Sequence, residues 1–238
     1  MNEDKLYIDE KGGDEPFRFD ASVARVFPDM LRRSIPGYAA SIEAIGSLAA
    51  RYVQPGTRCY DLGCSLGAAS LAMLQGSRTP DFHIVAVDNS EAMIDRCAEV
   101  VAGHDNIELA LADVRDIAIE NASMVVLNYT LQFLDPGSRD ALIRRICAGL
   151  VPGGLLVLSE KVVDENPNIE ELLVDLHHEH KRRNDYSQLE ISRKRAALEN
   201  VLIPETVAAH RQRLADAGFA HSAVWLRYFN FVSIVAIK

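Results

Sequence analysis

The strongest constraint on the fold is the stretch at residues 58–67, Arg-Cys-Tyr-Asp-Leu-Gly-Cys-Ser-Leu-Gly. Its first half has the composition of a buried strand end, and residues 68–74 have that of a helix. Gly63 and Gly67 bracket the turn between them. Strand, glycine turn and helix form the nucleotide-binding corner of open α/β sheets. Asp61 falls where the strand should end, so its carboxylate can reach a ligand that lies over the sheet edge.

Apolar strand-like segments and amphipathic helical segments alternate from residue 57 onward. The predicted strands are 57–61, 82–87, 106–111, 123–127, 154–159, 220–228 and 230–237. The predicted helices between and after them are 67–75, 91–101, 137–150 and 205–217. Such alternation is typical of a parallel, doubly wound sheet, and the last two strands are close enough in sequence to require an antiparallel hairpin.

The spacing Asp-x-Gly-x-x-x-Gly resembles the S-adenosylmethionine site of class I methyltransferases more than the dinucleotide fingerprint, although Ser65 stands where the common form has a third glycine. We therefore predict an α/β fold of the Rossmann-like, class I methyltransferase type. Its mostly parallel sheet has seven strands and closes with the C-terminal antiparallel hairpin. N-terminal helices and a helical insertion complete the fold.

A single domain is expected from a chain of 238 residues. Its predicted parts are an N-terminal arm with helices (1–52), the core (53–160), the helical insertion (161–203) and the last helix with the hairpin (204–238). Residues 1–19 are polar and are predicted to be mobile or ordered by a ligand. Pro28 and the corner at 35–38 are expected to interrupt the helical region 20–52. Pro152-Gly153-Gly154 is expected to form a turn before the fifth strand.

Composition narrows the function classes. The net charge of −9 makes direct nucleic-acid binding unexpected without a local basic patch. Met1 to Glu15 contains no apolar core segment, and no apolar run approaches a membrane span, so neither a signal peptide nor a membrane contact is expected. The four cysteines form no CxxC pair and indicate free thiols in a reducing cytoplasm.

Carboxylates and an amide follow successive strands. Asp88 ends the second strand, where a carboxylate accepts hydrogen bonds from both ribose hydroxyls. Asp113, followed by the apolar Val114, could accept from an adenine amino group. Asn128 ends the fourth strand, where it could lie under the sulfonium; a neutral amide cannot act as a strong base. The alternative for Asp88, as for Asp61, is a solvated strand-end aspartate. For Asp113 it is a loop with local ion pairs, and for Asn128 it is a strand-end cap.

Two charged clusters lie in the insertion. His177-His178-Glu179-His180 borders an apolar stripe through Leu173 and Leu176; with no identifiable partner ligand, a hydrogen-bonded histidine face is favoured over a metal site. The triplet Arg193-Lys194-Arg195 is of a kind that is usually solvated. Because the insertion should cover the site, one arginine could bind a carboxylate there. The pattern does not choose which.

The chain resembles the carboxy-S-adenosyl-L-methionine synthase family over essentially its full length. The matching segments are Phe19-Asp20, 23–30, 33–38, 60–69, Asp88-Asn89-Ser90, 115–123, 190–192 and 198–201. The N-terminal segments and Ser65 carry most of the specificity, because the remaining core would fit many methyltransferases.

The resemblance implies an unusual reaction. S-adenosyl-L-methionine, as a substrate, and prephenate would give carboxy-S-adenosyl-L-methionine and phenylpyruvate. Loss of carbon dioxide and hydroxide from prephenate yields an aromatic ring. A base, such as the released hydroxide, could take a proton from the sulfonium methyl group, and the resulting carbanion would attack the carbon dioxide. Such chemistry needs a crevice that excludes water and a cation for the new carboxylate.

The resemblance also implies binding residues and partners. The cofactor contacts carry over as Tyr38, Gly63, Cys64, Ser65, Asp88, Asn89, Asp113, Val114 and Asn128, beside Asp61 from the motif itself. Arg195 matches the arginine that holds the new carboxylate. No metal is implied. The product would feed a tRNA carboxymethyltransferase that modifies a wobble uridine. Apolar stripes on the insertion and the N-terminal helices favour a homodimer.

Two other functions share these motifs. The first is a conventional S-adenosylmethionine-dependent methyltransferase acting on a small molecule or tRNA; the product mass discriminates it. The second is a non-catalytic nucleoside-binding scaffold, which turnover of prephenate would exclude.

Overall fold

The computed structural model describes residues 3–6, 17–198 and 201–238. Most of the predicted N-terminal arm lies outside these residues. The strands are β1 (Thr57–Leu62), β2 (Phe82–Asp88), β3 (Ile107–Leu111), β4 (Ala122–Asn128), β5 (Leu150–Val163), β6 (Glu205–Thr206), β7 (His221–Tyr228) and β8 (Phe231–Ile237). The helices are α1 (Ala21–Ser34), α2 (Tyr38–Tyr52), α3 (Ala68–Gly76), α4 (Glu91–Val100), α5 (Pro136–Gly149), α6 (Pro167–Arg183), α7 (Gln188–Leu198) and α8 (Val207–Asp216), with the 3-10 turn η2 (Leu131–Phe133).

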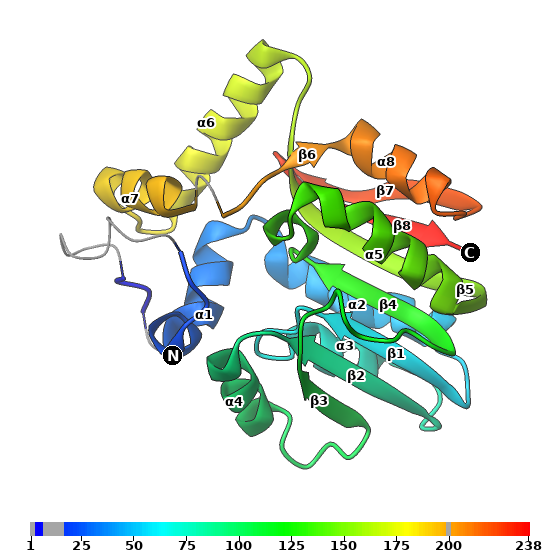
Figure 1. Cartoon of the computed structure of the whole chain (residues 1–238). Coiled ribbons are helices and arrows are strands. Elements are labelled where there is room, and N and C mark those ends of the chain that lie inside the picture. The colour runs from blue at the N-terminus through cyan, green and yellow to red at the C-terminus, as the bar shows by residue number, and fades with distance from the viewer. Residues whose placement is uncertain (1–2, 7–16, 199–200) are drawn as a thin grey trace.

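The sheet has the predicted organisation, with strand order β3-β2-β1-β4-β5-β8-β7 (Figure 1). The first five of these strands are parallel, and β8 is antiparallel to both β5 and β7. The short β6 adds an eighth strand beside the end of β5. The chain leaves β1 toward β2 on one side, whereas β4 lies on the other, so a topological switch point lies between β1 and β4.

Both faces of the sheet are covered, as parallel sheets require. On one face, side chains of α2 and α3 pack against Met124 and Val126 of β4. On the other face, α5 and α8 pack against Val125 and Leu127 of the same strand. Since successive side chains of a strand point to opposite faces, the uninterrupted apolar run of β4 is buried on both sides. Helices α1, α6 and α7 gather at one end of the sheet, beyond the carboxyl ends of the parallel strands (Figure 1).

Two predicted interruptions are wrong. Pro28 lies inside α1 and does not break it. The proline faces solvent, where water can satisfy the carbonyl that its missing N–H leaves unpaired, while Phe27 and Met30 are buried and hold the helix in place. Pro152–Gly154 lies within β5, which begins at Leu150; the pairing with β4 shifts register across this segment. The 35–38 corner does separate α1 from α2.

The predicted apolar stripes differ in their exposure. Val23, Val26 and Phe27 of α1 are buried within the chain, so the expectation that this stripe needs a second subunit is wrong. On α6, Ile169 and Leu172 are 43% and 52% exposed. Among the described helices, none is long and apolar enough to cross a membrane.

Candidate active site

The glycine turn after β1 lies against the end of β2. The backbone N–H groups of Gly63 and Cys64 both donate to the Val87 carbonyl, at 2.8 and 2.9 Å. Gly63 has a φ of +82°, and a Cβ there would overlap the Thr130 side chain. Ser65 adopts a φ of +48°, so a serine takes the left-handed conformation for which glycine is the usual choice. The turn therefore keeps its shape without the third glycine.

Asp88 ties the turn to the second strand. One carboxylate oxygen accepts from the Ser65 N–H and the other from the Ser90 N–H, both at 2.9 Å. Burial raises the pKa of this carboxyl group. Each carboxylate oxygen retains a further lone pair for a ligand. Ser90 caps α4, because its side chain accepts from the N–H of Met93.

Asp61 supports the helix that follows the turn. Its Oδ2 accepts from the Ser70 backbone N–H at 2.9 Å and from the Ser70 hydroxyl at 2.6 Å. Burial raises its pKa to about 6. A buried carboxylate that is hydrogen-bonded to the first turn of α3 fixes the helix, and with it the glycine turn, relative to β1.

Asp113, in the segment after β3, both forms a local ion pair and lines the cavity. Asp113 forms an ion pair with Arg115 at 2.7 Å, and Arg115 lowers the pKa of that carboxyl group. Such a local pair was the alternative to a ligand contact. Asp113 nevertheless lines the same cavity as Asp61 and Asp88, next to the buried side chain of Val114.

Asn128 has an unpaired acceptor atom that a ligand could use. Its Oδ1 is buried and has no hydrogen-bond partner. Buried polar atoms without a partner are rare and costly, so an acceptor that lines a cavity is suited to a donor on a bound molecule. Tyr129, which follows it, has a φ of +63° and also lines the cavity, and burial raises its pKa.

One cavity of about 670 Å³ collects all of the predicted site residues. They are Tyr38, Asp61, Gly63, Cys64, Ser65, Asp88, Asn89, Asp113, Val114, Asn128 and Arg195. Three carboxylates, Asp61, Asp88 and Asp113, come from the ends of β1 and β2 and the loop after β3. The four cations come from the end of β5 and from α6 and α7, where Glu170 is the one further carboxylate that the described residues place in the lining. The walls of the cavity therefore carry opposite charge at its two ends.

The cationic wall contains residues that the sequence did not reveal. Of the triplet 193–195, Lys194 is the most buried, with 5% exposure, while Arg195 lines the cavity and remains exposed. Lys161 and Lys181 line the cavity as well. Lys161 follows the apolar run of β5, and its place at a parallel strand end was a usable signal. Lys181 gave no such signal in the sequence, because it belongs to a basic run on a helix.

The histidine cluster forms the favoured hydrogen-bonded face. His177 is buried, its Nε2 lies 2.9 Å from the Ser34 carbonyl, and its ring packs edge-on against Phe231. Burial and nearby lysines lower its pKa, so the ring is neutral and donates to the carbonyl. Among the residues that the structure describes, no three His, Cys, Asp or Glu side chains are grouped to hold a metal ion. All four cysteines are free and buried.

Sheet order, switch-point cavity and glycine turn together define a class I methyltransferase fold. Residues 60–154 match the family model described as a methyltransferase domain. An O-methyltransferase family protein from Burkholderia thailandensis superposes with a TM-score of 0.67 at 17% identity, covering 92% of this chain and 60% of that one.

Two closer relatives are both named carboxy-S-adenosyl-L-methionine synthase. The relative from Trichlorobacter lovleyi is 56% identical over 226 residues, which cover 93% of each chain. The relative from Shewanella oneidensis is 52% identical over 100% of this chain and 99% of its own. The chain belongs to the carboxy-S-adenosyl-L-methionine synthase family.

Proposed function

We propose that the protein converts S-adenosyl-L-methionine and prephenate into carboxy-S-adenosyl-L-methionine and phenylpyruvate. The observation that carries the proposal is the single cavity with carboxylates at one end and cations at the other. A cofactor with a sulfonium and an adenosine suits the first end, and a substrate with carboxylates suits the second. Family membership supports this assignment.

The adenosyl end offers donors and acceptors that fit the cofactor. Asp88 holds the ribose hydroxyls, and Asp113 accepts from the adenine amino group while Val114 packs on the ring. Gly63 allows the backbone to approach the cofactor closely, and the unpartnered Oδ1 of Asn128 gains a partner. S-adenosyl-L-methionine supplies the methyl carbon that becomes carboxylated.

The transfer step needs little from the protein's acids and bases. Asn128 is neutral and remains a binding group. Arg195 receives the new carboxylate through its guanidinium, because a charged fork fits a carboxylate in two parallel hydrogen bonds. Phe19 and Phe133, whose rings pack edge-to-face at 5.2 Å, line the cavity and help to exclude water.

Incubation with both substrates tests the proposal. The wild-type protein is expected to increase the mass of the cofactor by one carbon dioxide and to release phenylpyruvate, as measured by mass spectrometry. Arg195→Ala is expected to lower this rate at least about tenfold, since charge-assisted hydrogen bonds contribute roughly 1.5–3 kcal/mol. Carboxylated product at the wild-type rate from this variant would contradict the role of Arg195.

The same experiment tests the alternatives. Formation of S-adenosylhomocysteine, without a carboxylated product, would favour a conventional methyltransferase. Cofactor binding without any turnover of prephenate would favour a nucleoside-binding scaffold.

The downstream reaction, the cellular compartment and the oligomeric state follow from the same assignment. The product serves a separate tRNA carboxymethyltransferase that makes 5-oxyacetyluridine at the wobble position, and the net charge of −9 argues against direct tRNA binding by this chain. Four reduced, buried thiols suit the cytoplasm. The exposed Ile169 and Leu172 of α6 suit a homodimer interface.

A further inference from the structure

The cationic end of the cavity contains four basic side chains from three elements. Lys161 comes from β5, Lys181 from α6, and Lys194 and Arg195 from α7. Lys181 and Lys194 are 8% and 5% exposed. Lysine is almost never buried to this extent unless its charge is paired. The partners of these ammonium groups therefore decide what the cluster does.

Lys194 has structural partners. Its Nζ donates to the Ser34 hydroxyl at 3.1 Å and lies 3.5 Å from Asp4 Oδ2. Asp4 in turn accepts from the Tyr186 hydroxyl. The ammonium group of Lys194 thus joins α7 to α1 and to the residues near the N-terminus. It is committed to the fold.

Lys161 and Lys181 have no such partner. Within the described residues, neither ammonium group forms an ion pair. The acid that acts on Lys161 from nearby is Glu170, whose Oε2 already accepts from the Asp164 N–H at 2.7 Å. His177 is neutral and adds no further positive charge.

The cost of this arrangement falls on the charged form of Lys181. Burial, with repulsion from Lys194 and Lys161, lowers its pKa to about 7, and only Asp4 opposes the shift. The pKa of Lys161 is lowered for the same first cause. Lys181 is buried and Lys161 is half-buried, and two such ammonium groups that repel each other are stabilised by an anion placed between them.

Sheet geometry separates this position from the adenosyl end. The carboxylates Asp61 and Asp88 follow β1 and β2, whereas Lys161 belongs to β5. Strand β4 lies between β1 and β5, so β5 is two strand spacings, about 10 Å, from β1 and three spacings, about 14 Å, from β2. Asn128, at the end of β4, lies between them. A ligand over β1 and β2 and a second ligand over β5 would meet above Asn128.

We propose that Lys161 and Lys181 form the binding site for a carboxylate of the second substrate, the carboxylate that the reaction does not transfer. The inference rests on the proposed function, in which prephenate carries one carboxylate on its ring and one on its pyruvyl side chain. The lysine pair holds the pyruvyl carboxylate, which remains in phenylpyruvate. The ring carboxylate then faces Asn128, and Arg195 is left to receive it after transfer.

Kinetics of the variants Lys161→Gln and Lys181→Gln test this assignment. Each is expected to raise the KM for prephenate about tenfold or more and to leave the KM for S-adenosyl-L-methionine within about twofold. Arg182→Gln is the matched control, because it removes a positive charge from the exposed neighbour of Lys181 and should change neither constant. An unchanged KM for prephenate overturns the proposal. A raised KM for S-adenosyl-L-methionine with an unchanged KM for prephenate would assign the lysines to the methionine carboxylate of the cofactor instead.

A binding measurement keeps the inference separable from the proposed function. Isothermal titration of phenylpyruvate into protein saturated with S-adenosylhomocysteine should give at least about tenfold weaker binding for both lysine variants than for Arg182→Gln. Equal affinities would overturn the lysine site even if wild-type turnover is normal. If the wild-type protein makes no carboxylated product, the proposed function fails, while this titration still tests the carboxylate site. Thermal melts of each variant confirm that it is folded.

Discussion

Gly63 lies at a position that only a residue without a Cβ can occupy without strain or steric overlap. Its φ of +82° disfavours any side chain, and a Cβ would meet the Thr130 side chain. Gly103 has a similar φ of +85°, but nothing lies within 4 Å of its would-be Cβ. Comparing substitutions at the two positions therefore separates the free-energy cost of a positive φ from the cost of the steric overlap with Thr130.

We expect Gly103→Ala to lower the free energy of unfolding by about 1 kcal/mol, the cost of the left-handed backbone. Gly63→Ala should lower it by roughly 1–3 kcal/mol more, because Thr130 must move. It should also weaken the binding of S-adenosyl-L-methionine. Urea unfolding and calorimetric titration measure the two effects. Equal stability losses in the two variants would show that Thr130 yields without cost.

His210 should make stability depend on pH. The side chain is 1% exposed, and its Nδ1 lies 3.2 Å from Arg213, which can only donate, so the ring accepts and is neutral. Burial and Arg213 lower its pKa to about 4, below the unfolded value of about 6.5. The unfolded chain therefore binds more protons between these values, and the contribution to stability is lost as pH falls from about 6.5 to 4.

The comparison with His210→Gln isolates this effect. Between pH 7 and 4, the wild-type protein should lose about 3 kcal/mol of unfolding free energy relative to the variant. Urea unfolding at several pH values measures the difference, and His221→Gln, at an exposed position, serves as the control. A constant difference between wild type and His210→Gln would contradict the assignment.

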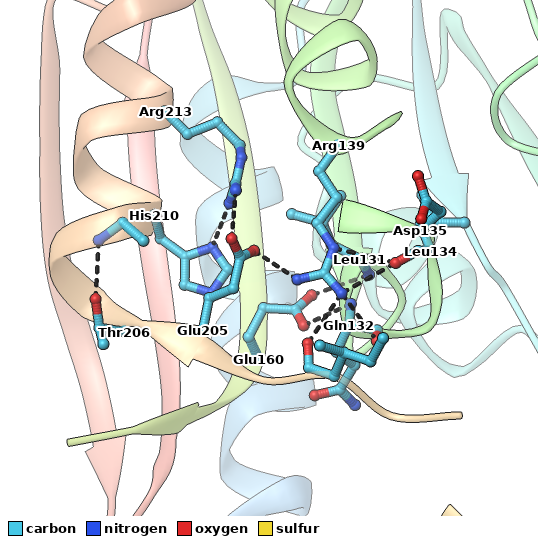
Figure 2. Close-up of polar contacts among 12 residues, drawn as sticks. Leu131, Gln132, Leu134, Asp135, Arg139, Glu160, Glu205, Thr206, His210 and Arg213 are labelled. Carbon is cyan, nitrogen blue, oxygen red and sulfur yellow. Dashed lines mark hydrogen bonds and ion pairs between the residues drawn. The ribbon is translucent and has the colours of Figure 1, made fainter. Parts of the chain in front are cut away.

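At the scale of elements, a buried ion network connects α5, β5, β6 and α8 (Figure 2). Arg139 is fully buried, pairs with Glu205 at 2.5 Å and donates to the carbonyls of Gln132, Leu134 and Ile203. Glu205 also pairs with Arg213 at 2.7 Å. Neighbouring Glu160 accepts from the N–H groups of Leu131 and Gln132, at 3.0 and 2.9 Å. The network fixes η2 and the approach to β6, and both border the cavity.

Truncation of Arg139 should therefore be costly. Arg139→Ala leaves Glu205 with one of its two partners and removes the guanidinium donor from the Leu134 and Ile203 carbonyls, while the Gln132 carbonyl keeps the Ile203 N–H. We therefore expect a loss of about 3–5 kcal/mol in unfolding free energy. Arg144→Ala, at an exposed position of the same helix, should change stability by less than about 0.5 kcal/mol. Chemical denaturation of both variants tests this expectation. Similar losses in the two variants would contradict the role of the network.

At the scale of the whole molecule, the charge is arranged unevenly. The chain has a net charge of −9, yet four basic side chains line the cavity. Meanwhile α6 extends away from the sheet (Figure 1) and presents Ile169 and Leu172 to solvent. We expect this exposed apolar pair on a protruding helix to contact a second copy of the chain.

We expect light scattering at micromolar concentration to give about twice the chain mass of 26.3 kDa. The double variant Ile169→Glu, Leu172→Glu should shift the protein toward the monomer, because two charges on each subunit would have to be buried at the interface. Val100→Glu, at another exposed apolar position, should not. A wild-type monomer would refute the homodimer, and a dimeric double variant would place the interface elsewhere.

The sequence alone determined the sheet, its C-terminal hairpin and the strand-end carboxylates that gather at one end of the cavity. Those features depend on local patterns: apolar runs of strand length, the Gly63 turn, and carboxylates such as Asp88 placed where strands end. Parallel strands bring their carboxyl ends to one edge, so the order of strands along the chain was enough to group the residues at those ends.

Tertiary structure decided the other end of the cavity. Lys181 and Lys194 belong to basic runs on helices, and such runs are usually solvated. Whether a helix directs a charge to solvent or into a cavity depends on how α6 and α7 pack across the strand ends, and no local pattern encodes that packing. Helix α1 continues through Pro28 for a similar reason, because the side chains next to the proline are buried against distant segments. Periodicity records which face of an element is apolar, whereas the partner of that face is set only when distant segments meet.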